Sequence, residues 1–149
     1  MDIVYHCFGG THSSVLAAAL HTGLLYDRQP RPGNSFFALP FFDTQDSKSQ
    51  GKLYFYGIDE CGNRVYIIGR GRDADALELV FGNQIDNDLQ AVVVNALSCV
   101  PFLLKIGGFI SRRLKLPRVG RPLVLAGMRQ GYACVRDLVY RVKTEVREE

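Results

Sequence analysis

The chain of 149 residues is 47% hydrophobic, which is enough to build one core, and we expect a single domain over residues 1–149. Lysine and arginine total 18 against 15 acidic residues, and the net charge of +3 is too small to require a specific nucleic acid as partner. No basic segment precedes an apolar run at the start of the sequence, so we expect no signal peptide and a cytoplasmic location.

The four cysteines are scattered and predict free thiols. They stand at positions 7, 61, 99 and 134, with no CxxC pair and no histidine at the spacing of a metal ligand. A domain with a core of this size does not need disulfides. The sequence therefore predicts neither a metal site nor a redox pair.

Residues 91–110 have the length and apolar character of a membrane span. The stretch is interrupted by Asn95, Pro101 and Lys105, and its β-branched beginning differs in character from the rest. We expect a buried strand, a loop and a helix here, and no membrane partner.

Residues 2–25 predict a strand, a glycine-rich turn and a helix. The apolar run at 3–7 is typical of a strand buried in a parallel sheet, and Gly9 and Gly10 permit backbone angles that are closed to other residues. The helix is expected to stop near Gly23. Three hydroxyl residues, which are favoured at helix N-caps, lie between the turn and the helix: Thr11, Ser13 and Ser14.

This turn is the most specific chemical feature of the sequence. Its N–H groups would point inward beside the positive end of a helix dipole, which is a favourable place for phosphate or sulfate. Two glycines and three hydroxyls within residues 9–14 exceed what a plain turn needs. The alternative is an ordinary strand-to-helix turn with a hydroxyl cap.

Further elements follow along the chain. The aromatic segment at residues 36–42 predicts a short helix at about 33–39, packed on the sheet or covering the pocket as a lid. The alternative is an exposed aromatic patch, which would mark a partner site. Residues 52–58 and 64–68 predict a β-hairpin. Beyond the hairpin we expect, in order, a helix at 73–82, a strand at 89–96, a helix at 98–114, a strand at 122–126 and a helix to about residue 143.

Strands that alternate with helices predict an α/β fold, here an open three-layer sandwich with a mainly parallel sheet and an added β-hairpin. Ligands of such sheets bind at the carboxyl ends of the strands. At these ends Arg70, Arg72 and Arg129 would face the glycine-rich loop and support an anionic ligand. Otherwise Arg70 and Arg72 belong to a flexible connector and are solvated.

The three histidines lack a nearby pair of carboxylates and do not indicate a metal site. His6, within the first strand, is expected to be a core residue with its hydrogen bonds satisfied, and His21 is expected to be structural. His12 lies in the loop, where it would donate to an anion or act as an acid or base near neutral pH, unless it is a solvated turn residue.

The loop resembles those of two families that handle phosphoryl groups. Cys7, Gly10, Ser13 and Ser14 fall on the Cys-x-x-Gly-x-x-Thr-Ser pattern of sugar phosphotransferase IIB carriers, with serine in place of threonine. In that family the cysteine is phosphorylated and the loop cradles the phosphoryl group. Low-molecular-weight tyrosine phosphatases share the spacing from Cys7 to Ser14 but have an arginine where this chain has Ser13. The alternative is an inert core cysteine at a strand end.

Over the whole chain, three segments resemble a small domain-of-unknown-function family from spore-forming Firmicutes. They are YHCFGGTHSSVLAAALHTGLL, FFALPFFD and YGIDECGNRVYIIGRG. The resemblance implies a bacterial cytosolic setting and no particular mechanism.

Together these features predict a domain that binds phosphate, or a phosphorylated metabolite or nucleotide, through residues 7–14. If it is an enzyme, phosphoryl transfer or phosphate hydrolysis is expected, with Cys7 as nucleophile and His12 as proton carrier. The alternative is a structural or protein-interaction role without catalysis, in which the basic C-terminal region and the aromatic segment would matter. The sequence indicates no cofactor and no oligomeric state.

Overall fold

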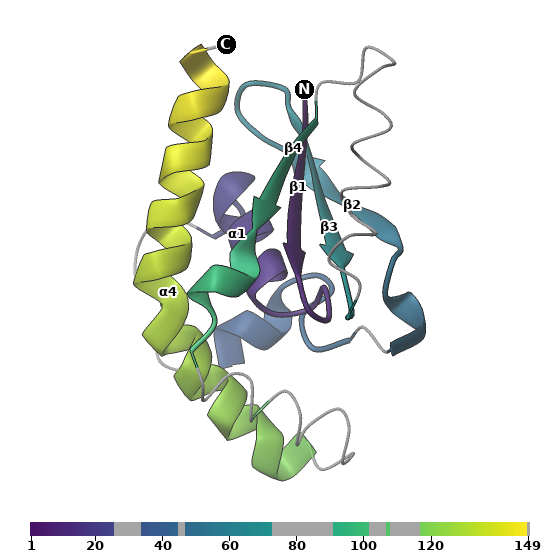
Figure 1. Ribbon diagram of the computed structural model, residues 1–149. Helices are drawn as coiled ribbons and strands as arrows, with labels where there is room; N and C mark the ends of the chain where they lie inside the picture. The colour runs from purple at the N-terminus through teal and green to yellow at the C-terminus, as the bar shows by residue number, and fades with distance from the viewer. Residues whose placement is uncertain (26–33, 45–46, 73–90, 102–106, 108–116, 149) are drawn as a thin grey trace.

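A computed structural model describes residues 1–25, 34–44, 47–72, 91–101, 107 and 117–148. Its elements in chain order are β1 (Asp2–Cys7), α1 (Ser13–His21), the 3-10 helices η1 (Asn34–Ala38) and η2 (Ser47–Ser49), β2 (Leu53–Ile58), β3 (Arg64–Gly69), β4 (Ala91–Asn95), the 3-10 helix η3 (Ala96–Cys99) and α4 (Pro117–Glu148). The strands form one sheet in the order β2-β3-β1-β4 (Figure 1). Because β1 is parallel to β3 and β4 while β2 is antiparallel to β3, the predicted α/β class, mainly parallel sheet and hairpin are confirmed.

The central strand β1 is buried along five of its six residues, as its apolar run predicts. Alternate side chains point to opposite faces, so Ile3 and Tyr5 join one core cluster while Val4 joins another. Buried residues of α1 and α4 belong to the same cluster as Ile3, and α4 runs along the side of the sheet next to β4 (Figure 1). Helices α1 and α4 therefore cover the same face. The loop from β1 to α1 lies at the carboxyl edge of the sheet.

The strand predicted at 122–126 is wrong, because these residues lie within α4. The apolar run there also fits a helix, and its buried positions continue at helical spacing: Val124, Met128, Val135, Val139 and Val142. Pro122 lies inside this helix, where it lacks the N–H that a regular turn would use. The predicted helix at 73–82 lies outside the described residues, as does most of the one at 98–114. The first two residues of the helix predicted at 98–114 belong to η3 instead.

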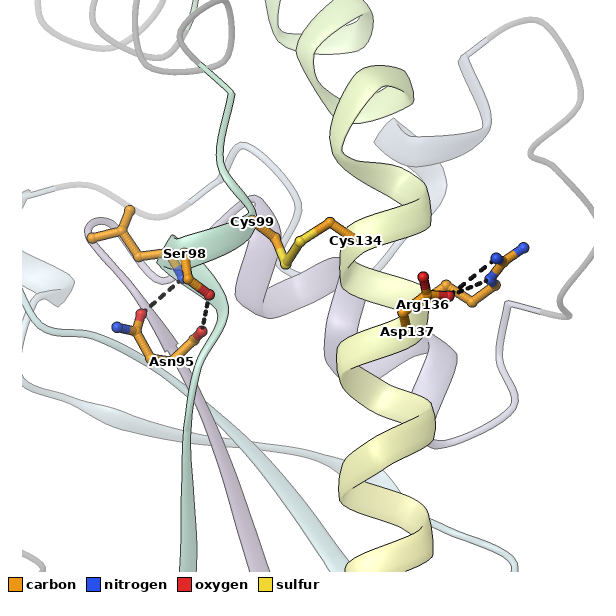
Figure 2. The surroundings of a disulfide bond; sticks show 7 residues. Asn95, Ser98, Cys99, Cys134, Arg136 and Asp137 are labelled. Atoms are coloured by element: carbon orange, nitrogen blue, oxygen red, sulfur yellow. Dashed lines mark hydrogen bonds and ion pairs between the residues drawn. A yellow bond between two sulfur atoms is a disulfide. The ribbon is translucent and has the colours of Figure 1, made fainter.

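The expectation of free thiols throughout is also wrong. Cys99 of η3 and Cys134 of α4 form a disulfide with a Cα–Cα distance of 5.5 Å (Figure 2). The two cysteines are 35 residues apart in sequence, so spacing motifs carry no information about their contact. Gly131, one helical turn before Cys134, allows the close approach, because a Cβ there would lie 2.7 Å from the Cys99 carbonyl oxygen. Cys7 and Cys61 remain free thiols.

The aromatic segment forms the predicted short helix, as the 3-10 helix η1. Phe36, Leu39 and Phe42 are buried, which confirms that the segment packs in the core. The stretch predicted to begin as a buried strand does begin with a strand, β4, but only Val94 of that strand is buried. Within the described ranges, no helix combines the length and the apolar character that a membrane crossing requires.

Candidate functional site

The loop from β1 to α1 is pressed against the end of β3. Pairing continues beyond both strands, because the Arg70 N–H donates to the Cys7 carbonyl at 3.0 Å and the Gly71 N–H donates to the Phe8 carbonyl at 2.9 Å. Gly10 has a φ of +67°, and a Cβ on it would lie 2.6 Å from the Gly69 nitrogen. A Cβ on Gly69 would in turn meet the Gly9 carbonyl carbon at 2.7 Å. The glycines therefore set the path of the loop, since only glycine combines this backbone angle with so close an approach.

The sulfur of Cys7 lies inside this loop. The Gly10 N–H donates to Cys7 Sγ at 3.2 Å, and the Ser14 hydroxyl lies 3.2 Å from the same atom. Burial by itself would raise the pKa of this thiol, but the Ser14 hydroxyl and the backbone N–H groups of Ser14, His12 and Thr11 hold the pKa below its ordinary value. These N–H groups lie at the N-terminus of α1, where the helix dipole favours negative charge. These hydrogen bonds favour the thiolate form of Cys7.

Replacing Ser14 by alanine is expected to raise the pKa of Cys7 by about one unit, because a hydrogen bond to a charged group is lost. Ultraviolet absorbance of the thiolate during a pH titration measures this. A Cys61→Ser background leaves Cys7 as the single free thiol. Ser13→Ala is the matched control, since the Ser13 hydroxyl is equally buried but has no hydrogen-bond partner among the described residues. Equal pKa values in the two variants would contradict the role given to Ser14.

A turn of the aromatic segment covers the loop. The Asp43 N–H donates to the Thr11 carbonyl at 3.2 Å, and the Thr11 hydroxyl donates to the Phe41 carbonyl at 3.0 Å. Phe41 and Asp43 have φ values of 64° and 55°, which are uncommon for residues other than glycine. Such backbone strain persists only where the surroundings fix it, and it clusters at ligand sites. The aromatic segment thus packs in the core and also lies against the loop.

Asp43 connects the loop to α4. Its carboxylate lies 3.2 Å from His12 Nε2 and accepts a hydrogen bond from Arg121 Nε at 3.3 Å. Burial would raise the pKa of Asp43, but His12 and Arg121 hold it below its ordinary value. The Arg121 guanidinium also lies over the Phe37 ring, 5.1 Å from its centroid. Asp43 is therefore ionised near neutral pH and fixes the orientation of the His12 ring.

The family model described as "Protein of unknown function (DUF3189)" matches residues 2–144, nearly the whole chain. The chain belongs to the DUF3189 family. This confirms the expected membership of a domain-of-unknown-function family. No curated protein and no solved structure matches the chain.

In this DUF3189 protein the loop brings together most of the predicted site residues: Cys7, Gly9, Gly10, Thr11, His12, Ser13 and Ser14. Arg70 reaches the loop through its backbone N–H, and Arg72 is exposed. Arg129 lies on the exposed side of α4. The strand that was expected to place Arg129 at the sheet edge is part of that helix. The topology therefore no longer predicts that Arg129 lies at the loop.

Sequence reasoning missed Asp43 and Arg121. Asp43 opens a polar stretch that is typical of a solvated loop, and Arg121 belongs to a generally basic C-terminal region. Asp43 lies 31 residues from His12 and 78 from Arg121, so no local pattern indicates that they meet. In the part of the DUF3189 chain that the structure describes, no three His, Cys, Asp or Glu side chains are grouped so that they could hold a metal ion.

Proposed function

We propose that this protein binds a phosphate-bearing small molecule in the loop of residues 9–14, and that Cys7 receives the phosphoryl group. The observation that supports this most is the set of donors around Cys7 Sγ, where the Gly10 N–H and the Ser14 hydroxyl both lie at 3.2 Å. Donors that hold a thiolate are also available to the oxygens of a phosphoryl group bonded to that sulfur. The similarity to the loops of two phosphoryl-handling families supports the same chemistry.

The proposed reaction has two steps. The Cys7 thiolate attacks phosphorus, so that an S–P bond forms while the bond from phosphorus to the leaving oxygen breaks. The leaving oxygen takes a proton from His12, whose ring is oriented by Asp43. Water or an acceptor hydroxyl then gives a proton to His12 and attacks phosphorus, the S–P bond breaks, and both the thiolate and protonated His12 are regenerated.

The serine at position 13 leads us to expect a slow reaction. Low-molecular-weight phosphatases have an arginine at this position of the loop, and this chain has serine. The negative charge that develops on the phosphoryl oxygens is then stabilised mainly by N–H groups and by the helix N-terminus. Slow turnover and a long-lived phosphocysteine follow, which favours a carrier or sensor of phosphoryl groups over a fast phosphatase.

Thermal unfolding in inorganic phosphate, sulfate, nucleotides and sugar phosphates tests the binding step. A ligand at a hundred times its dissociation constant adds about 2.7 kcal/mol to the free energy of unfolding, or roughly 3–6 °C in melting temperature for a chain of this size. Cys7→Ser is expected to keep most of this shift, because the loop donors remain. The wild type is expected to form a phosphocysteine that phosphorus NMR would detect, and Cys7→Ser should not form it.

Cys61→Ser is the matched control, because it removes the other free thiol, which is exposed. It should change neither the thermal shift nor the phosphocysteine signal. A shift without any phosphocysteine would reduce the proposal to a binding role. If no anion raises the melting temperature, the proposal fails, and the alternative of a protein-interaction role gains support.

A further inference from the structure

Two polar groups beside the loop are buried and have no hydrogen-bond partner among the described residues. His6 is only 8% exposed, and its Nδ1 has no hydrogen-bond partner among the described residues. The Nε of Arg70 is buried and unpartnered in the same way. Buried polar atoms without partners are rare in native proteins, and each calls for an explanation. The expectation that His6 is a fully satisfied core residue is therefore wrong.

His6 and Arg70 lie on the same face of the sheet at its carboxyl edge. His6 pairs in register with Ile68 of β3, and Arg70 follows Ile68 by two residues, so that the strand alternation puts both side chains on one face. Burial lowers the pKa of His6, and the positive charge of Arg70 lowers it further. Cys7, one residue after His6, points to the opposite face.

We infer that His6 and Arg70 form a second binding site, which takes a phosphate or carboxylate group on the face of the sheet opposite the Cys7 thiol. The Arg70 Nε–H and the His6 Nδ1–H would supply two donors to one oxyanion. Arg70 is partly exposed, and Asn95, the register partner of His6 on β4, is exposed. The site is thus open to solvent beside His6. It does not depend on the function proposed for the loop.

An oxyanion fits these two residues better than a metal ion. The positively charged guanidinium group of Arg70 repels a cation. Its guanidinium group matches the oxygen geometry of phosphate and carboxylate. A bound anion would also favour the charged imidazolium of His6, so that binding and protonation of His6 reinforce each other.

Side-chain NMR of the histidines of the full chain, with inorganic phosphate in one arm and acetate in the other, tests this site. The two arms separate a phosphate site from a carboxylate site. Saturating anion is expected to raise the pKa of His6 by about one unit. Arg70→Met should weaken the effect of the anion on His6 about tenfold. Arg70→Lys, which keeps the charge but not the forked donors, should fall between.

Arg64→Met is the matched control, because Arg64 lies on the same face at the other end of β3 and pairs with Asp2 at 2.6 Å. Arg64→Met should leave the His6 response unchanged. A His6 resonance that responds to neither anion overturns the inference, and so does a wild-type response in folded Arg70→Met. If the loop amides respond to phosphate while His6 does not, the second site fails and the loop proposal stands.

Discussion

Replacing Gly10 by alanine is expected to lower the free energy of unfolding by about 3 kcal/mol or more, since backbone strain and a steric clash add at this position. The left-handed φ of +67° disfavours any side chain. The new Cβ would also lie 2.6 Å from the Gly69 nitrogen and 3.0 Å from its Cα. Both contacts are with backbone atoms of a central strand, which cannot move aside as a flexible side chain would.

Gly62→Ala is the matched control for Gly10→Ala. Gly62 has a φ of +84°, but a Cβ there would meet nothing within 4 Å. This variant should therefore lose only the strain contribution, roughly 1–2 kcal/mol. Urea unfolding of the two variants and the wild type measures the difference. Equal losses in both variants would show that the loop is not pressed against β3 as described.

The second large effect is expected at His21, which is fully buried and joins three elements. Its Nδ1 lies 2.7 Å from the Tyr5 hydroxyl, and its Nε2 lies 3.1 Å from Asp59 Oδ2 at the hairpin tip. His21→Leu keeps much of the volume but leaves the Tyr5 hydroxyl and part of the Asp59 carboxylate unpaired. We expect a loss of about 3 kcal/mol in the free energy of unfolding. Tyr5→Phe, which removes one hydroxyl, should lose about 1 kcal/mol.

The lowered pKa of His21 also makes the free energy of unfolding depend on pH. Burial holds the pKa of His21 below its ordinary value, although Asp59 acts in the opposite direction, and burial lowers the pKa of His6 as well. The unfolded chain therefore binds more protons than the folded one once the pH falls below about 6.5, so stability decreases from there towards acid. In His21→Leu this first decrease should be smaller. An unchanged slope between pH 7 and pH 5 would contradict the assignment.

The carboxylates add a second, more acidic transition. The pKa values of Asp43 and Asp59 are held below their ordinary range by their hydrogen bonds, against the effect of burial. Their contribution to stability is present above the unfolded pKa of about 4 and is lost as the pH falls through the lower folded values. Asp59→Asn should reduce the second decrease and, because Asp59 raises the pKa of His21, make the first decrease somewhat larger.

The first strand, the loop, the first helix and the hairpin could be predicted because their patterns are local. Gly9 and Gly10 between a buried strand and a helix specify a turn by backbone geometry alone. The hairpin of β2 and β3 follows from two strand-like runs around Gly62. Residues 122–126 could not be assigned correctly, because a short apolar run fits a strand or a buried helix equally well.

Local sequence patterns did not predict the contacts between segments that are distant in the chain. The disulfide between Cys99 and Cys134 depends on how α4 passes η3, and no spacing rule describes it. The approach of Asp43 to His12 depends on the left-handed turn at Phe41 and Asp43, which no glycine marks. That His6 Nδ1 lacks a partner among the described residues depends on packing, since sequence alone shows only a histidine in a strand.

Phosphate binding by the loop is tested most directly by amide NMR of the full chain during a titration with inorganic phosphate. We expect saturable shifts at the N–H groups of Gly10, Thr11, His12 and Ser14, which surround Cys7 Sγ. Gly62, at the hairpin tip, should not change and serves as an internal reference. Shifts confined to the basic residues of α4, or no saturable shift in the loop, would contradict phosphate binding at Cys7.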